Sequence, residues 1–179
     1  MEMDKQRILI IPDVHGRDFW KKAVEETPCE RIVFLGDYVD PYEREGITPE
    51  QALGVFFEVL DLKKTNPKKV VLLLGNHDMH YLSEPFREMA CGSRYDEDLS
   101  GIIFNLLNAQ KKSFRLAHEE VVAGKRYLFT HAGVNALWYE RHRETIKELT
   151  AKNLNHLMAT KKGVTALAVI GKIRGGYLP

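Results

Sequence analysis

Four short clusters of Asp, Asn and His are the residues of this sequence whose types and spacing could carry out chemistry. The clusters are Asp13-Val14-His15-Gly16, Gly36-Asp37-Tyr38-Val39-Asp40, Gly75-Asn76-His77-Asp78 and His131-Ala132-Gly133. Carboxylate and amide oxygens and neutral imidazole nitrogens bind divalent metals such as manganese, iron and zinc. A lone Asp in such a place is usually a helix cap or turn residue, with roughly one chance in ten of binding a metal. Four clusters in succession are far more specific, and together they predict a metal site.

Each cluster directly follows a short apolar segment, at residues 7–11, 31–35, 69–74 and 126–130. The first three have the composition of strands that are buried on both faces. Functional sites of open α/β sheets form at the carboxyl ends of strands, so the four clusters are expected to meet at one place. The glycines allow the sharp turns that point the side chains inward.

Helical patterns separate the first three strands. Residues 17–26 form one predicted helix. Thr48 is the predicted N-cap of the next, with Pro49 at the first helical position and an end near Lys64. Strands that alternate with helices favour an α/β layered fold, in which a parallel sheet at the start is followed by mixed strands.

The second half of the chain has longer helical patterns. Residues 81–112 are helical with a break at residues 91–93, and we expect them to form a cap or side insertion. Residues 137–157 are charged and periodic, which predicts a further helix.

An antiparallel hairpin is predicted between these two helical regions. Its first strand comprises residues 113–118 and 120–122, its turn residues 123–125, and its second strand residues 126–130.

Length and composition indicate one ordinary globular unit. The chain has 179 residues, 44% of them hydrophobic, and we expect a single domain over residues 1–179. The net charge of +1, from 26 Lys and Arg against 25 Asp and Glu, gives no sign of a nucleic-acid surface. No signal peptide or membrane span is predicted, and Cys29 and Cys91 form no metal or redox motif. A cytoplasmic protein with reduced thiols is therefore expected.

The motifs Asp-x-His, Gly-Asp-x-x-Asp, Gly-Asn-His-Asp and His-Ala-Gly, in this order, resemble the calcineurin-like metallophosphoesterase superfamily. The resemblance covers residues 8–133. It implies a layered metallophosphoesterase core and a hydrolase with two divalent metal ions (Mn, Fe or Zn). In that superfamily the two ions hold a bridging water and lower its pKa, and the resulting hydroxide attacks the phosphate ester.

The resemblance also implies the metal ligands. Asp13 and His15 would bind the first ion. Asp37 would bridge both ions, because a carboxylate has two oxygens. Asn76 and His131 would bind the second ion.

Three further motif residues receive roles that are not metal binding. His77 would donate a proton to the leaving oxygen or stabilise its charge. Asp40 would hydrogen-bond the other nitrogen of His77 and keep the ring protonated. Asp78 is expected to be structural, accepting hydrogen bonds from backbone donors near the turn.

The arginines of the Ser/Thr protein phosphatases in this superfamily are missing. Those proteins carry Arg directly after the second motif and directly before the third, where this chain has Pro41 and Leu74. An Arg fork holds phosphate, so the difference argues against that branch. Arg17 and Arg44 are the candidates for substrate binding near the site, although a solvated surface charge is the commoner role of each.

A late Gly-His motif, whose His completes the second metal site in the superfamily, is also missing. After His131 the sequence has only His142 and His156, in a predicted helix and without a preceding Gly, so an exposed helix surface is the simpler reading. Residues 171–179 have a loop-like composition, and the final strands of the superfamily are not recognised. We therefore hypothesise a fold truncated at its C-terminus, by design or by nature, with a weakened second metal site.

Two functions stay open on these grounds. The leading hypothesis is metal-dependent hydrolysis of a phosphomonoester or small phosphodiester, with a nucleotide or a phosphoprotein among the candidate substrates. The alternative is a metal-binding fragment of the same fold without turnover. A nucleotide-binding module is disfavoured, because no Gly-rich loop follows the first strand. Substrate choice is expected to depend on residues 41–47 and 81–112.

Overall fold

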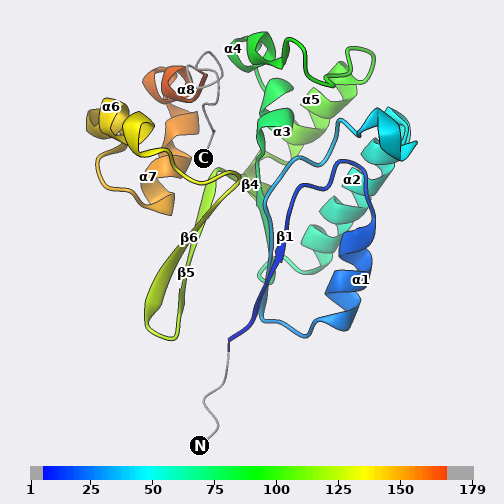
Figure 1. Cartoon of the computed structure of the whole chain (residues 1–179), viewed down its shortest axis with the longest axis horizontal. Helices are drawn as coiled ribbons and strands as arrows, with labels where there is room; N and C mark the ends of the chain where they lie inside the picture. The colour runs from blue at the N-terminus through cyan, green and yellow to red at the C-terminus, as the bar shows by residue number, and fades with distance from the viewer. Residues whose placement is uncertain (1–5, 169–179) are drawn as a thin grey trace, which may run out of the picture.

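The centre of the fold is a four-stranded parallel sheet with the strand order β1-β2-β3-β4 (Figure 1). The computed structural model describes residues 6–168. The strands are β1 (Ile8–Ile11), β2 (Arg31–Phe34), β3 (Val70–Leu73) and β4 (Phe114–Arg115). Neighbouring strands pair in parallel throughout, so the carboxyl ends of all four strands lie on the same side of the sheet, where the strands end. This arrangement confirms the predicted α/β fold.

Helices α1 (Phe19–Glu26) and α2 (Pro49–Thr65) cover one face of this sheet (Figure 1). The core on this side is aromatic: Tyr38 stacks on Phe56 with ring centroids 4.7 Å apart, and Trp20 meets Phe34 edge-on. Tyr38, Phe34 and Phe56 are all fully buried. Because Tyr38 directly follows Asp37, this packing anchors the turn that carries a predicted metal ligand.

The antiparallel hairpin of β5 (Ala117–Val122) and β6 (Lys125–Thr130) lies on the other face of the sheet (Figure 1). Phe129 of β6 packs against Val33, Val71 and Leu73 of the sheet. The hairpin therefore brings the end of β6, and His131 after it, towards the carboxyl ends of the parallel strands.

The prediction of one strand over residues 113–118 is wrong. Residues 114–115 form β4 of the parallel sheet, and the chain then changes sheets to begin β5. Asn155 explains the change, since its Oδ1 accepts hydrogen bonds from the backbone N–H groups of Leu116 and Ala117 at 2.7 and 3.0 Å. A side chain from a distant helix thus takes the place of a strand partner at the switch point.

Short helices make up most of residues 76–113. They are α3 (Asn76–His80), α4 (Glu84–Arg87), the 3-10 turn η2 (Glu88–Ala90), α5 (Ser100–Ala109) and the 3-10 turn η3 (Lys111–Ser113). The expected break at residues 91–93 is present as a turn. The role of residues 81–112 as a cap stays a prediction, and we call them the helical segment below.

The single helix predicted over residues 137–157 is divided into α6 (Ala136–Ile146) and α7 (Ala151–His156), followed by the 3-10 turn η4 (Leu157–Ala159). Lys147 ends α6 with a positive φ of 63°, and Thr150 begins α7 as an N-cap that accepts a bond from Asn153 N–H. Local capping thus overrides the continuous pattern. Helix α8 (Lys161–Ala168) follows, and the loop expected over residues 171–179 lies outside the described residues.

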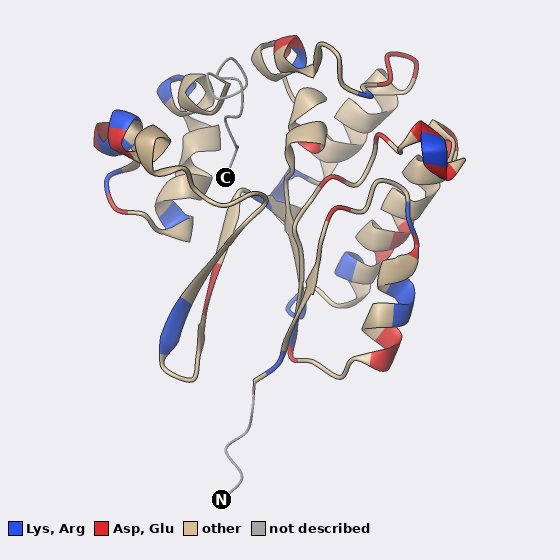
Figure 2. Cartoon of the chain, viewed as in Figure 1, with Lys and Arg blue, Asp and Glu red and all other residues tan. Residues whose placement is uncertain are grey.

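Charged residues of both signs are interspersed over the outer helices, and acidic residues also stand in the loops after β1 and β2 (Figure 2). Among the helices of residues 6–168, none combines the length and the apolar character that a bilayer crossing requires.

A short 3-10 turn, η1 (Glu43–Glu45), lies in the loop between β2 and α2.

Thr48 and Gln51 form a capping box at the start of α2. Gln51 N–H donates to Thr48 Oγ1 at 3.3 Å, and Thr48 N–H donates to Gln51 Oε1 at 2.8 Å. Thr48→Ala is expected to lower the free energy of unfolding by about 1 kcal/mol, measured by urea denaturation, because Gln51 N–H loses its acceptor. Thr48→Ser keeps the hydroxyl and serves as the control. An equal loss in the Ser variant would show that the methyl group, and not the cap, stabilises this helix.

Candidate metal centre

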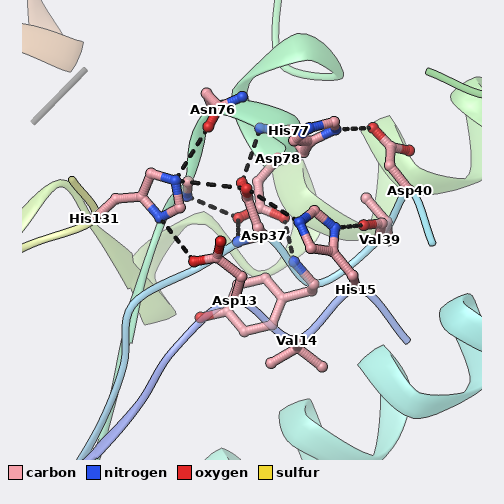
Figure 3. A network of polar contacts seen from close by, with 12 residues as sticks. Asp13, Val14, His15, Asp37, Val39, Asp40, Asn76, His77, Asp78 and His131 are labelled. Carbon is pink, nitrogen blue, oxygen red and sulfur yellow. Dashed lines mark hydrogen bonds and ion pairs between the residues drawn. The ribbon is translucent and has the colours of Figure 1, made fainter. Parts of the chain in front are cut away.

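Asp37 occupies the middle of the site, in the turn directly after β2 (Figure 3). Its side chain is only 4% exposed, so its oxygens depend on protein partners. Oδ1 accepts a hydrogen bond of 2.9 Å from His77 N–H. Oδ2 lies 3.5 Å from Nε2 of His15 and 3.5 Å from Nε2 of His131. One carboxylate thus stands between two imidazoles, as a bridging ligand would.

Asp78 holds the Asp37 turn in place. It is buried, and its Oδ2 accepts bonds of 2.8 Å from the backbone N–H groups of both Asp37 and Gly75, while Oδ1 accepts one of 2.9 Å from Tyr38 N–H. The turns after β2 and β3 are therefore joined through one side chain, which confirms the expected structural role. Burial raises the pKa of Asp78 and the neighbouring Asp37 carboxylate adds to this, whereas the three N–H groups act in the opposite direction.

The close approach of these two turns requires glycine. Gly36 has φ of 112°, and a Cβ on Gly36 or on Gly75 would overlap backbone or side-chain atoms of the opposite turn. His15, Asp37 and Asp40 also have positive φ values of 45°, 53° and 58°. Such backbone strain in residues other than glycine is concentrated at functional sites.

His15 and His131 are oriented by backbone carbonyls. His15 Nδ1 donates to Val39 O at 2.8 Å, and His131 Nδ1 donates to Leu35 O at 3.0 Å. A carbonyl can only accept, so the neutral form of each ring has its lone pair on Nε2, the nitrogen that faces Asp37. Burial lowers the pKa of His15, which favours that neutral form.

The donor set fits a divalent cation. Asp37 Oδ2, the two Nε2 atoms and Asn76 Oδ1 are all electron-pair donors, and Asn76 Oδ1 lies 3.1 Å from His131 Nε2. Lone pairs that face one another repel, and a cation between them relieves the repulsion. Asp13 completes the set, with ligand atoms of Asp13, Asp37 and His131 within 4.8 Å of one another.

The grouping of the ligands differs in one respect from the pairing that the resemblance implies. Asp13 lies with His131, its Oδ1 being 3.8 Å from His131 Nδ1, whereas His15 groups with Asp37 and His77. Because Asp37 belongs to both groups and Asn76 Oδ1 lies beside His131, the other four predicted ligands still lie around the Asp37 side chain (Figure 3). Their division between two ions stays a prediction.

His77 and Asp40 stand beside the ligands as a hydrogen-bonded pair. His77 Nδ1 lies 2.6 Å from Asp40 Oδ2, and both residues are buried. The Tyr81 hydroxyl donates to the other oxygen, Oδ1, of Asp40. Burial raises the pKa of Tyr81, with Asp40 as the second cause, so the phenol stays protonated as a donor. Asp40 is thus held from both sides.

Three arginines surround the ring of Tyr42 next to this pair. Arg94 lies 3.8 Å from the ring centroid, Arg44 5.1 Å and Arg17 5.9 Å. The fork of Arg17 is already engaged, since it donates to the carbonyls of Asp13 and Val14. Arg44 is exposed. The proposed substrate-binding roles of Arg17 and Arg44 stay predictions.

Arg94, Tyr42 and Tyr81 were missed by the sequence reasoning. Arg94 Nε donates to Asp40 O at 2.9 Å, although 54 positions separate the two residues, and no local motif marks this arginine. The only available signal was its place in the helical segment, where substrate choice was expected. His142 and His156 lie on α6 and α7 and belong to none of the ligand clusters in residues 6–168. His156 is exposed as expected, whereas His142 is partly covered by Trp138.

The sequence as a whole matches the family described as calcineurin-like phosphoesterase over residues 6–170. The match includes all four motifs and extends well beyond half of the 179 residues. The chain therefore belongs to the calcineurin-like phosphoesterase family.

Removing the Asp78 carboxylate is expected to destabilise the fold. Asp78→Ala leaves three buried N–H groups without acceptors, each worth about 1–3 kcal/mol, and frees the Asp37 turn. Chemical denaturation should show a loss of several kcal/mol, and calorimetry a weaker binding of Mn²⁺. Asp61→Ala, at an exposed position of α2, is the matched control. Unchanged stability in Asp78→Ala would contradict the structural role.

His80 should make the fold sensitive to acid. It is 5% exposed, its Nδ1 has no hydrogen-bond partner within residues 6–168, and burial lowers its pKa to about 4. Protonation therefore favours the unfolded chain, and the stability present above pH 6.5 is lost as the pH falls towards 4, by up to about 3 kcal/mol. Urea denaturation at several pH values should show a shallower loss in His80→Phe, which cannot be protonated. Identical slopes would contradict this assignment.

Proposed function

We propose that this chain is a metal-dependent phosphoesterase that hydrolyses a phosphomonoester or a small phosphodiester. The observation that carries the proposal is the convergence of electron-pair donors from three other chain segments around Asp37 (Figure 3). Membership of the calcineurin-like phosphoesterase family supports the reaction class. Two divalent ions, of Mn, Fe or Zn, are the proposed cofactors, held by Asp13, His15, Asp37, Asn76 and His131.

The bound ions would neutralise charge on the phosphate and supply an acidic water as the nucleophile. The protein contributes the geometry. Asp37, fixed by Asp78 and by His77 N–H, keeps the ligands of both ions at a constant separation. The backbone carbonyls of Val39 and Leu35 hold the imidazoles of His15 and His131 with Nε2 facing inward. Little reorganisation is then required on substrate binding.

His77 is the proposed proton donor to the leaving oxygen. Its Nδ1–H is bonded to Asp40, so the proton to be transferred would be carried on Nε2. Asp40 fixes the orientation of the His77 ring through this bond, and Tyr81 holds the carboxylate in the position that the contact requires. The substrate is proposed to be a small phosphorylated molecule, with nucleotides and phosphoproteins as candidates.

A metal-binding domain without turnover is the second candidate, because no Gly-His ligand is recognised for the second ion. The count of bound ions separates the two. Two ions per chain support the enzyme, whereas a single ion together with no hydrolysis supports the binding domain.

Two substitutions test the proposal in different ways. With Mn²⁺ added, the chain should hydrolyse p-nitrophenyl phosphate or its bis-ester. His77→Ala should keep Mn²⁺ binding but lower turnover by about a hundredfold to ten-thousandfold, because only proton transfer is lost. Asp37→Asn should weaken Mn²⁺ binding itself, as measured by calorimetry. His156→Ala, on the exposed surface of α7, should change neither quantity. Activity that is independent of Mn²⁺, or unaffected in His77→Ala, would overturn the proposal.

A further inference from the structure

We infer that Arg94 binds the phosphoryl group of the substrate and makes the site prefer a terminal phosphate. The inference rests on the proposed function, since it names the substrate class of the same site. The first observation in support is the position of the Arg94 guanidinium. Arg94 Nη2 lies 3.5 Å from His15 Nε2 and 3.5 Å from His77 Nε2. It therefore stands between a proposed metal ligand and the proposed proton donor, where the phosphoryl group must pass.

The side chain is held rigidly in this place. Arg94 Nε donates to Asp40 O at 2.9 Å, and the face of the guanidinium covers the Tyr42 ring at 3.8 Å. The Tyr42 ring in turn meets His15 edge-on, with centroids 5.0 Å apart. A guanidinium fixed through Nε and one face, with only long contacts of 3.5 Å at Nη2, can direct its terminal N–H groups to a ligand, which is the arrangement that binds phosphate in a fork.

The loop that carries Arg94 is fixed to the same pair of catalytic groups. Tyr95 stacks on Tyr81 with ring centroids 4.5 Å apart, and Asp96 N–H donates to the Tyr81 hydroxyl at 2.9 Å. Tyr81 itself donates to Asp40, the partner of His77. The helical segment thus places Arg94 relative to His77 through Asp40 and Tyr81.

The charge of Arg94 has no anionic partner in the part of the chain that the structure describes. Within residues 6–168 it forms no salt bridge, whereas Arg17 pairs with Glu45 at 3.7 Å and bonds the carbonyls of Asp13 and Val14. Arg94 is partly buried next to two imidazoles, an unfavourable place for an unpaired cation. A bound anion would offset this cost, and a phosphate is the anion that this family acts on.

The preference for a terminal phosphate follows from counting oxygens. A phosphomonoester has three non-bridging oxygens and up to two negative charges, whereas a diester has two such oxygens and one charge. A guanidinium beside the metal ligands gains most from the third oxygen and the second charge. The Ser/Thr protein phosphatases carry phosphate-binding arginines at the positions that Pro41 and Leu74 occupy here. In this chain Arg94, which belongs to the helical segment, would take over their role.

Binding of inorganic phosphate tests the inference without turnover. The full chain loaded with Mn²⁺ is titrated with inorganic phosphate in a calorimeter. Arg94→Gln should raise the dissociation constant about tenfold or more, which corresponds to about 1.4 kcal/mol per factor of ten. Arg94→Lys keeps the charge without the fork and should recover part of the affinity. Arg87→Gln, at an exposed position of α4, is the matched control and should bind like the parent chain.

Kinetics with two esters separate substrate binding from a structural role. In Arg94→Gln the KM for p-nitrophenyl phosphate should rise about tenfold or more, while hydrolysis of the bis-ester changes less than about threefold. A structural role would lower both activities equally, together with the melting temperature. If Arg94→Gln does not fold, Tyr42→Leu removes the ring beneath the guanidinium and should shift phosphate affinity and ester preference in the same direction.

Each outcome has a distinct meaning. Phosphate affinity that is unchanged in Arg94→Gln, or an unchanged ratio of the two ester activities, would overturn the inference, as would a parent chain that binds no phosphate. If the parent chain binds phosphate through Arg94 and hydrolyses neither ester, the proposed function fails and the role of Arg94 stands.

Discussion

The site depends on the buried Asp78 carboxylate, which is hydrogen-bonded to the turns after β2 and β3. Asp78 accepts three backbone N–H bonds, from Asp37, Tyr38 and Gly75, and so ties the end of β2 to the end of β3. Two parallel strands would otherwise leave these donors unsatisfied as the chain turns away from the sheet. Because the turns are joined, the Asp37 carboxylate has one position, and the histidines can be arranged around it.

The site contains energetically unfavourable interactions, and the packing of the rest of the fold offsets their cost. The Nε2 lone pairs of His15 and His131 face the Asp37 carboxylate, and Asn76 Oδ1 faces His131 Nε2. His15, Asp37 and Asp40 also have left-handed backbone conformations. The aromatic core beneath, in which Tyr38 stacks on Phe56, holds this arrangement together. A cation would convert the crowded donors from a cost into a source of stability, so metal binding and folding stability are expected to be linked.

Two parts of the chain form the site, and each has a different role. The turns that follow the strands of the sheet and of the hairpin supply the proposed metal ligands. The helical segment supplies Arg94 and Tyr81, which contact Asp40 and the imidazoles but belong to loops and short helices. Loops tolerate variation more readily than strands do. The metal centre would then define the reaction, and the helical segment would define which phosphate ester is accepted.

The sequence by itself determined the three parallel strands and the cap of α2, because each depends on local chemistry. The metal ligands implied by the family resemblance stay a prediction. An apolar run ending in Gly-Asp or Gly-Asn-His specifies a buried strand and its functional end within a few residues. Tertiary structure decided what depends on distant partners. Asn155 divided the predicted strand at residues 113–118 between two sheets, and Arg94 donates a hydrogen bond to Asp40 O across 54 positions of the sequence. Long-range hydrogen bonds of this kind leave no periodic pattern in the chain, because the partners become neighbours only when the core has formed.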